Sequence, residues 1–383
     1  MKSKIKIKKK DIFFFLLIAT YTSRAITDAI FVAQNVNSIW VSLKYVLLLI
    51  TMAYGSFVLL QNKKEWKSLY LVKYVGITVA MFALISAIRM IHTGVFSTAV
   101  FAIAFKMIFP AFVAVLVVSI GDSEDVFRCF AWILIITLVT YCTLEKGLDL
   151  FSEDTFSNIS FETSSFSLES HYTSGTAAAL CGFFSYYRKN KLWAILALVF
   201  SVLTFKRVYV IMSIVIFVLP WFVNMRKRTK PVVRMLAAWG FVAATLVYAW
   251  MMIPENHGFL QDLFNIESVY DFTSSRSAFF ESVYSDPFFV NFGWGACENQ
   301  IGKMFEMDLI QMLIEVSVVG LVTFSLCYWK IAGATRYSVI LMAWQFVNML
   351  GSHSLAGGFI WLILLVTFAQ IESDSLSSCV KKR

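Results

Sequence analysis

Charged residues that could act on a phosphate-bearing substrate lie between the apolar segments. Lys206 and Arg207 separate two apolar runs, Arg276 lies in a long polar stretch, and Glu306 and Asp308 precede the next apolar run. A guanidinium pairs with phosphate through two parallel hydrogen bonds and stays charged at any working pH. A carboxylate nearby can take the proton from an attacking hydroxyl. These residue types predict a site where a hydroxyl displaces a phosphorylated leaving group.

The stretch DFTSSRSAFFESVYSDP predicts a short amphipathic helix that positions Arg276. Thr273 or Ser274 can serve as its N-cap, and the Asp286-Pro287 pair can stop it. We expect such a helix to lie on the membrane surface with Arg276 in its first turn, where the helix N-terminus adds partial positive charge. Its apolar residues at helical spacing are Phe279, Phe280, Val283 and Tyr284.

A glycine turn and a histidine complete the candidate binding residues. Gly293 and Gly295, in FGWG, permit a sharp turn or a close approach of the backbone to a ligand. His171 opens HYTSGTAAALCGFF, whose small residues predict a helix that packs closely against its neighbours in lipid. We interpret His171 as a structural hydrogen-bonding residue or a substrate ligand. The other histidines, like His171, fall at the ends of apolar runs or in long loops: His92, His257 and His353.

The elements that must position these residues are membrane helices. The chain of 383 residues is 59% hydrophobic and only 15% charged, too little charge to cover a soluble protein of this size. Its apolar blocks are continuous and long enough to cross a bilayer, which takes about 20 residues per helix. The sequence therefore predicts an all-α polytopic membrane protein that forms a single integral-membrane domain over residues 1–383.

Hydropathy predicts about twelve spans, and charge predicts their orientation. With the N-terminus inside, the inner segments hold 22 of the 33 lysines and arginines and the outer loops hold five, as the positive-inside rule requires. Both termini are then cytoplasmic, the first apolar run is an uncleaved span, and the outer loops include 146–170 and a large one at 254–307. The predicted spans are 11–33, 40–61, 69–91, 97–118, 126–145, 171–187, 192–205, 208–224, 235–253, 308–328, 335–351 and 356–371.

Plainer explanations exist for each charged candidate. Lys206 and Arg207 can be the tip of a tight hairpin whose cations extend to the headgroups, and Arg276 can be an ordinary interfacial anchor. Glu306 and Asp308 can lie in water. Outer cations are scarce, however, and two adjacent ones favour a phosphate site at the outer membrane boundary.

Several function classes are excluded or made improbable by the same pattern. The basic residues form short clusters between apolar blocks, so nucleic acid is not expected as a partner. The inner segments are short and lack a Walker loop, so ATP-driven chemistry inside the cell would need another protein. The six cysteines form no disulfide framework, and without CxxC or HExxH we expect no metal site and no cofactor.

Two segments resemble a known family. The tract SRSAFFESVYSDPFFVNFGWG followed by EMDLIQMLIEVSVVGL resembles the outer-loop signature of bacterial O-antigen and exopolysaccharide repeat-unit polymerases (Wzy-type) and of the related O-antigen ligases. Those families carry SR, then a P…FG.G turn, then a span like HNDYLQLLIEFGIVGL. LTFKRVYVIMSIVIFVL is similar to their TFSRTGLL-type span. The match covers about a fifth of the chain.

The resemblance implies roles for individual residues. Arg207 and Arg276 match the paired functional arginines, and Gly293 and Gly295 match the glycine turn. Glu306 stands where the family has the histidine of HND, and Asp308 stands at its aspartate. Because the ligases rely on that histidine, its replacement favours a polymerase and leaves the base open between the two carboxylates. The interval from Arg276 to Gly293 also departs from the usual one.

The activity that the resemblance implies is glycan transfer in a bacterial cytoplasmic membrane. A helical glycosyltransferase of the C-type superfamily (GT-C) would move a growing chain from undecaprenyl pyrophosphate onto a lipid-linked oligosaccharide repeat unit at the outer face. Its partners would be that lipid-linked oligosaccharide, the lipid bilayer, a chain-length regulator and a flippase. The substrate-binding residues would be Lys206, His171, Gly293 and Gly295.

Three other hypotheses remain open. A ligase would move finished glycan to another acceptor. A lipid-glycan flippase or small-molecule transporter would use intramembrane charges, such as Arg24 and Asp28, which are spaced to pair on one helix face, and Lys106. A sensor or accessory scaffold would depend on none of these side chains.

Overall fold

The computed structural model describes residues 8–32, 38–147, 173–186, 191–273, 275–333 and 335–380, with side chains up to 375. These residues form helices and no strand. A backbone in lipid must satisfy its own hydrogen bonds, which a helix does within one segment. The described chain divides into two compact units: Met1–Leu69, Phe112–Met225 and Leu362–Arg383 form the first, and Tyr70–Ala111 and Arg226–Trp361 form the second.

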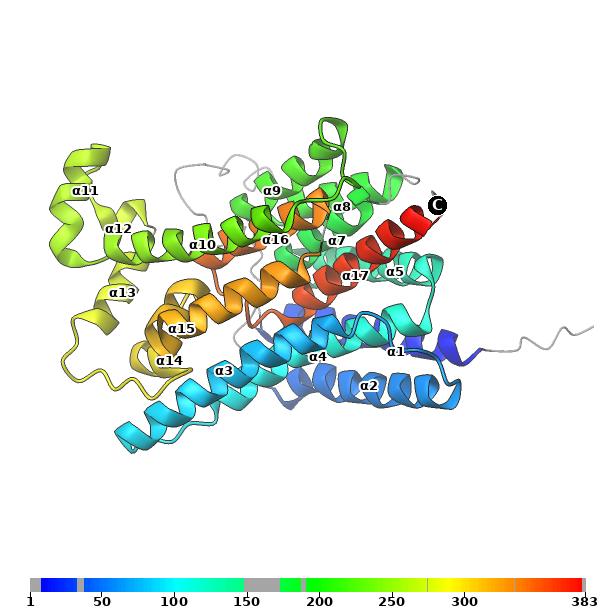
Figure 1. Cartoon of the computed structure of the whole chain (residues 1–383), viewed down its shortest axis with the longest axis horizontal. Coiled ribbons are helices and arrows are strands. Elements are labelled where there is room, and N and C mark those ends of the chain that lie inside the picture. Colours follow the sequence, from blue (N-terminus) through cyan, green and yellow to red (C-terminus); the bar gives the residue numbers. More distant parts are fainter. Residues whose placement is uncertain are drawn as a thin grey trace, which may run out of the picture. The chain divides into compact units, whose positions relative to one another are not determined.

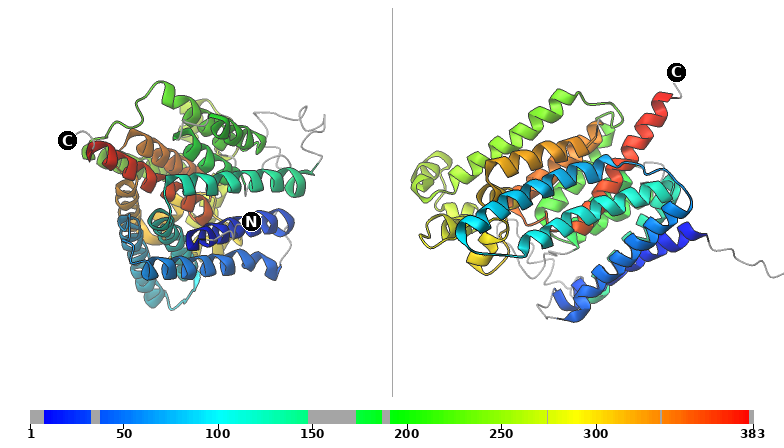
Figure 2. Two further views of the ribbon diagram at one scale, coloured as in Figure 1. Left: turned by 90° about the vertical axis from the view of Figure 1, so that its right-hand side faces the viewer. Right: turned by 60° about the horizontal axis from the view of Figure 1, so that its bottom comes forward.

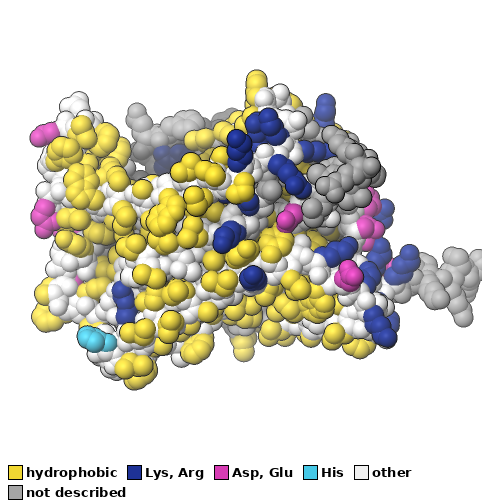
Figure 3. Space-filling model, viewed as in Figure 1, with side chains coloured by type: hydrophobic (Ala, Val, Ile, Leu, Met, Phe, Trp, Pro, Cys, Tyr) yellow, Lys and Arg dark blue, Asp and Glu magenta, His cyan; other side chains and the backbone are white. Residues whose placement is uncertain are grey.

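Within the described residues, eight helices are long and apolar enough to cross a membrane, which makes the chain a multi-pass membrane protein. The other four predicted spans coincide with helices of 12 to 16 residues, shorter than the roughly 20 residues of a simple crossing. Figure 3 shows apolar side chains over much of the visible surface, as expected for a lipid-facing molecule. The eight spans are Lys9–Phe31, Ile39–Gln61, Tyr70–Thr93, Ala99–Ile120, Ser123–Glu145, Pro231–Met251, Asp308–Ile331 and Gly358–Ser375.

The first unit pairs α1 with α2 and packs α7 against α8 and α9, and Figure 2 shows α1 beside α2. Every residue of α7 is buried, which confirms the close helix packing predicted from its small residues. Its elements are α1 (Lys9–Thr27), π-helix η1 (Asp28–Val32), 3-10 helix η2 (Ile39–Ser42), α2 (Leu43–Gln61), α5 (Ser123–Thr140), π-helix η3 (Tyr141–Glu145), α7 (Ser174–Tyr186), α8 (Lys191–Leu203), α9 (Arg207–Val218) and 3-10 helix η5 (Leu219–Trp221).

The second unit is built around α15, which packs against α3 and α10. Figure 1 shows α11 to α14 gathered where α10 ends and α15 begins. Its elements are α3 (Tyr70–Thr93), α10 (Pro231–Met251), 3-10 helix η6 (Pro254–Asn256), α11 (His257–Phe264), α12 (Val269–Phe272), α13 (Arg276–Tyr284), α14 (Ala296–Ile301), α15 (Asp308–Ile331) and α16 (Arg336–Gly351). The helices α4 (Ala99–Ile120) and α17 (Gly358–Val380) contribute to both units.

The span that begins at Asp308 is interrupted, which the sequence did not predict. Val316 and Ser317 leave helical geometry, with Ser317 at a φ of 61°. The break leaves the carbonyl of Ile314 without its usual helical partner, and two side chains bind it instead. Arg89 donates from Nη1 at 2.9 Å and Asn291 from Nδ2 at 2.7 Å.

Candidate functional site

The long loop at 254–307 is folded over its described residues and places Arg276 at the start of α13. The expected N-cap was wrong in detail: the helix begins after Ser275, which lies in the left-handed region at a φ of 63°. Thr273 still serves the helix, because its hydroxyl accepts the backbone N–H of Ser277 at 3.2 Å. Ser274 lies outside the described residues.

The apolar side of α13 packs on other helices of the second unit. Phe280 and Val283 are buried in a cluster with Met252 after α10 and Ile310 of α15. The sequence predicted an amphipathic helix resting on lipid, but here those side chains are covered by protein, and Tyr284 alone of the four predicted apolar residues is exposed. This packing fixes Arg276 at the junction of the loop and the bundle.

The guanidinium of Arg276 contacts the protein through its two terminal nitrogens. Its Nη1 donates to the carbonyl of Thr273 at 3.2 Å, and its Nη2 lies 3.9 Å from Oε2 of Glu306. Glu306 has 49% of its side chain exposed, so the ion pair is weak. The buried Nε has no hydrogen-bond partner among the described residues. A buried donor without an acceptor costs about 1–3 kcal/mol. The side chain of Arg276 is 25% exposed, so an anion can reach the exposed part of the guanidinium.

Asp308 differs sharply from Glu306, two positions earlier. It is fully buried, and its Oδ2 accepts the backbone N–H groups of Ser354 and Leu355, both at 2.6 Å. Its Oδ1 lies 3.2 Å from Nδ1 of His353. Asp308 therefore ties the start of α15 to the segment between α16 and α17.

His353 joins the candidate site, although its position in the sequence does not distinguish it from the other histidines. Its side chain is 15% exposed, with Oε1 of Glu298 at 3.8 Å and Asp308 closer. Burial disfavours the charged imidazolium, but the two carboxylates outweigh burial and the repulsion from Lys106, and the pKa of His353 is raised above its ordinary value of 6.5.

The glycine turn docks the loop onto α3 and α4. Gly293 and Gly295 have φ values of 100° and 92°, and a Cβ at Gly293 would lie 2.6 Å from the Cα of Ser86. Trp294 donates its backbone N–H to Ser86 at 3.1 Å and stacks on Phe82, with ring centroids 5.2 Å apart. Both glycines, predicted as substrate-binding residues, are buried in these packing contacts.

Replacing Gly293 with alanine is expected to loosen the long loop. The substitution combines a left-handed backbone with a backbone clash, and strain of this kind costs on the order of 1–3 kcal/mol. We expect faster proteolysis within 254–307. Gly302→Ala is the matched control, because Gly302 has a φ of 67° but nothing within 4 Å of an added Cβ. Equal protease sensitivity of the two variants would contradict the docking role of Gly293.

A buried carboxylate secures the other end of the turn. Oε1 of Glu315 accepts the backbone N–H of Cys297 at 2.8 Å, and Nε2 of Gln311 lies 3.1 and 3.2 Å from its two oxygens. Burial, together with Glu315, raises the pKa of the Cys297 thiol, which makes that thiol unreactive. The loop is thus attached at the break in α15.

The remaining predicted cations lie in the first unit. Residues 204–206 link α8 to α9, and Lys206 and Arg207 lie at this tight connection, as predicted. Nζ of Lys206 lies 5.6 Å from the ring centroid of Tyr209. Ser201 and Ser213 join the two helices with a 2.7 Å hydrogen bond. His171 lies outside the described residues, as does most of the predicted loop at 146–170.

The first unit also contains a buried charge network. Nε of Arg24 lies 3.2 Å from Oδ2 of Asp28, which confirms the predicted pair, and Lys44 binds the other oxygen of Asp28. Arg24 also donates to Thr176 of α7 at 2.9 Å. The network therefore ties α1 to α2 and α7.

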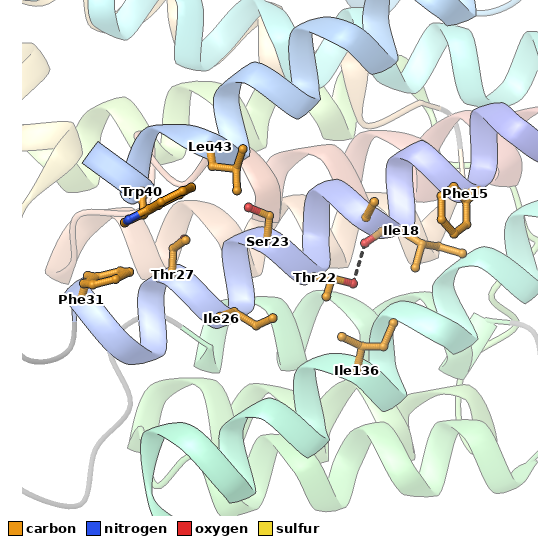
Figure 4. A pocket seen from close by; sticks show the side chains of 11 residues that line it. Phe15, Ile18, Thr22, Ser23, Ile26, Thr27, Phe31, Trp40, Leu43 and Ile136 are labelled. Carbon is orange, nitrogen blue, oxygen red and sulfur yellow. Dashed lines mark hydrogen bonds between the residues drawn. The ribbon is translucent and has the colours of Figure 1, made fainter. Parts of the chain in front are cut away.

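An apolar groove of about 690 Å³ lies beside this network in the same unit. Figure 4 shows side chains of α1, α2 and α5 around it, with Thr22 hydrogen-bonded to the carbonyl of Ile18 at 2.9 Å. None of its lining residues is charged, so it suits a hydrocarbon chain better than a sugar. It is lined by Phe15, Ile18, Ala19, Thr22, Ser23, Ile26, Thr27, Phe31, Trp40, Leu43 and Ile136.

Comparison with known proteins adds no further information about the site. No protein-family model matches the chain, and no curated protein or solved structure matches it either.

Proposed function

We propose that this protein is a glycan polymerase of the C-type glycosyltransferase architecture, acting at the outer face of a bacterial cytoplasmic membrane. It would transfer a growing polysaccharide from undecaprenyl pyrophosphate onto a lipid-linked oligosaccharide repeat unit. The observation that carries the proposal is the environment of Arg276: a guanidinium fixed by the packing of α13, with a buried Nε that has no partner among the described residues.

The chemistry follows from the charges. An acceptor hydroxyl attacks the anomeric carbon of the growing chain, the bond from that carbon to the pyrophosphate breaks, and undecaprenyl pyrophosphate leaves with the electron pair. Arg276 would offset the charge that develops on the leaving group. A basic side chain at the outer face of the membrane would accept the proton of the acceptor hydroxyl. His171 would contribute to binding the substrate.

A ligase is the second candidate, and one observation favours it. The sequence has glutamate where ligases carry a histidine, but His353 brings an imidazole to within 3.2 Å of Asp308 from a different segment. An imidazole is therefore present beside the carboxylate in spite of the substitution at Glu306.

The break in α15 gives less support to a transporter than to a glycan polymerase. Interrupted membrane helices in transporters use free carbonyls and carboxylates to bind cations. Here Arg89 and Asn291 bind the carbonyl of Ile314, and Glu315 accepts from Cys297 and Gln311. These oxygens already have donors from the protein.

Deleting the gene for this protein from its host and measuring the sizes of the lipid-linked glycans distinguishes a polymerase from a ligase. A polymerase predicts that single repeat units accumulate on undecaprenyl pyrophosphate and that the wild-type chain restores a ladder. A ligase predicts long glycan retained on the lipid carrier. An unchanged ladder, both on lipid and on the final acceptor, would contradict both.

A further inference from the structure

The two carboxylates that the sequence offers as the base are poorly placed for that role. Asp308 is fully buried, and two backbone N–H groups occupy its Oδ2. Its Oδ1 faces the ring of His353 at 3.2 Å. Glu306 is accessible, but it lies against the Arg276 guanidinium that is proposed to meet the leaving group. Each carboxylate already lies against another group of the protein, so neither is free to accept a proton from an acceptor hydroxyl.

His353 has the geometry that the carboxylates lack. Nδ1 of His353 lies 3.2 Å from Oδ1 of Asp308, and neither atom has a hydrogen-bond partner among the described residues. A proton on Nδ1 would face this carboxylate, which favours the tautomer of the neutral ring whose lone pair lies on Nε2. The side chain of His353 remains 15% exposed, and Nε2 is not among its buried atoms that lack a partner.

The backbone around His353 is fixed on both sides. The backbone N–H of Asp308 donates to the carbonyl of Ser352 at 3.5 Å. The hydroxyl of Ser352 donates to the carbonyl of Asn348 at 2.7 Å. On the other side of His353, the backbone N–H of Ser354 donates to Oδ2 of Asp308. The hydroxyl of Ser354 accepts a hydrogen bond from Nε2 of Gln345 at 3.2 Å. Such contacts hold a reactive side chain in one orientation.

We propose that His353 is the general base of the transfer and that Asp308 is the residue that positions it; this inference rests on the proposed function. Nε2 of His353 takes the proton from the acceptor hydroxyl while that oxygen forms a bond to the anomeric carbon. The bond from this carbon to the pyrophosphate oxygen breaks, and the pyrophosphate departs as an anion beside Arg276. The proton on His353 is then released to water.

The charges around His353 predict the pH dependence. Asp308 of α15 and Glu298 of α14 face the ring and favour its protonation, while Lys106 of α4 opposes it. A base must be neutral, so activity should rise with pH through a midpoint above the ordinary histidine value of about 6.5. Removing either carboxylate should move this midpoint to lower pH.

The test uses the full-length protein in proteoliposomes, with undecaprenyl pyrophosphate that carries one repeat unit, extracted from host cells lacking the chain. His353→Gln should lower the elongation rate roughly 10²- to 10⁴-fold, with unchanged binding of undecaprenyl pyrophosphate. Asp308→Asn should lower the rate as well, since an amide cannot hold the same tautomer. Glu298→Gln, at a partly exposed position, should fold normally and shift the pH midpoint downward with most of the rate retained.

His92→Gln is the matched control, because His92 is an exposed histidine in the same unit. If the wild-type protein elongates the glycan and His353→Gln does so with the same rate and the same pH profile, this inference is overturned and the proposed function stands. No elongation and no binding of undecaprenyl pyrophosphate by the wild-type protein would overturn the proposed function, and the inference with it.

Discussion

An Arg276→Ala variant is expected to reduce the glycan ladder to single lipid-linked repeat units at an unchanged protein level. The side chain combines a buried Nε lacking a partner among the described residues with an Nη2 that only a weak ion pair engages. Loss of one donor that stabilises a departing anion costs roughly 10²- to 10³-fold in rate. The ladder is measured by resolving lipid-linked glycans by size in the native host.

Two further variants sharpen the Arg276 result. Arg276→Lys keeps the charge but loses the planar set of donors, so we expect partial activity. Lys303→Ala removes an exposed cation of the same loop, whose Nζ lies 3.9 Å from the ring centroid of Phe279, and should leave the ladder intact. A full-length ladder in Arg276→Ala would reduce this arginine to a structural anchor.

Replacing Asp28 with alanine is expected to produce the largest loss of stability. The side chains of Asp28 and Lys44 are each only 9% exposed, and the substitution removes the carboxylate that Lys44 shares with Arg24. Breaking a buried ion pair by removing one partner costs about 3–5 kcal/mol. Thermal unfolding of the purified protein measures this loss, and Lys44→Met in the same chain should restore part of it.

The exposed pair of Arg128 and Glu124, at 3.0 Å, provides the control for this measurement. Both side chains are mostly in solvent, so Glu124→Ala should change the stability by less than about 1 kcal/mol. If Asp28→Ala kept the wild-type stability but lost all activity, the network would belong to a substrate path, and the transporter hypothesis would gain support.

The sequence predicted the helices well because apolar composition and length determine them. Each predicted span coincides with a helix, and Arg24 pairs with Asp28 as their spacing indicates. The break at Val316 and Ser317 escaped prediction because no glycine or proline occupies those two positions. It depends on partners distant in the sequence, among them Arg89, which binds the freed carbonyl of Ile314.

Part of the candidate site was predictable, and part was not. The nearness of Glu306 to Arg276 agrees with the grouping of both in one loop signature. Asp308 was predicted as a reactive carboxylate, yet it is buried against the segment at His353, where its Oδ2 accepts the backbone N–H groups of Ser354 and Leu355. No local spacing connects α15 to that segment, so His353 could be identified only once the fold had brought the two together.

The most direct test of the central claim is elongation by the purified wild-type protein. Proteoliposomes containing this protein and undecaprenyl pyrophosphate that carries one repeat unit are incubated without nucleotide sugar, and the lipid-linked products are separated by size. We expect a ladder of longer glycans and one released undecaprenyl pyrophosphate for each unit added. If only single repeat units remain, with the protein folded and the lipid substrate bound, the chain is not the polymerase.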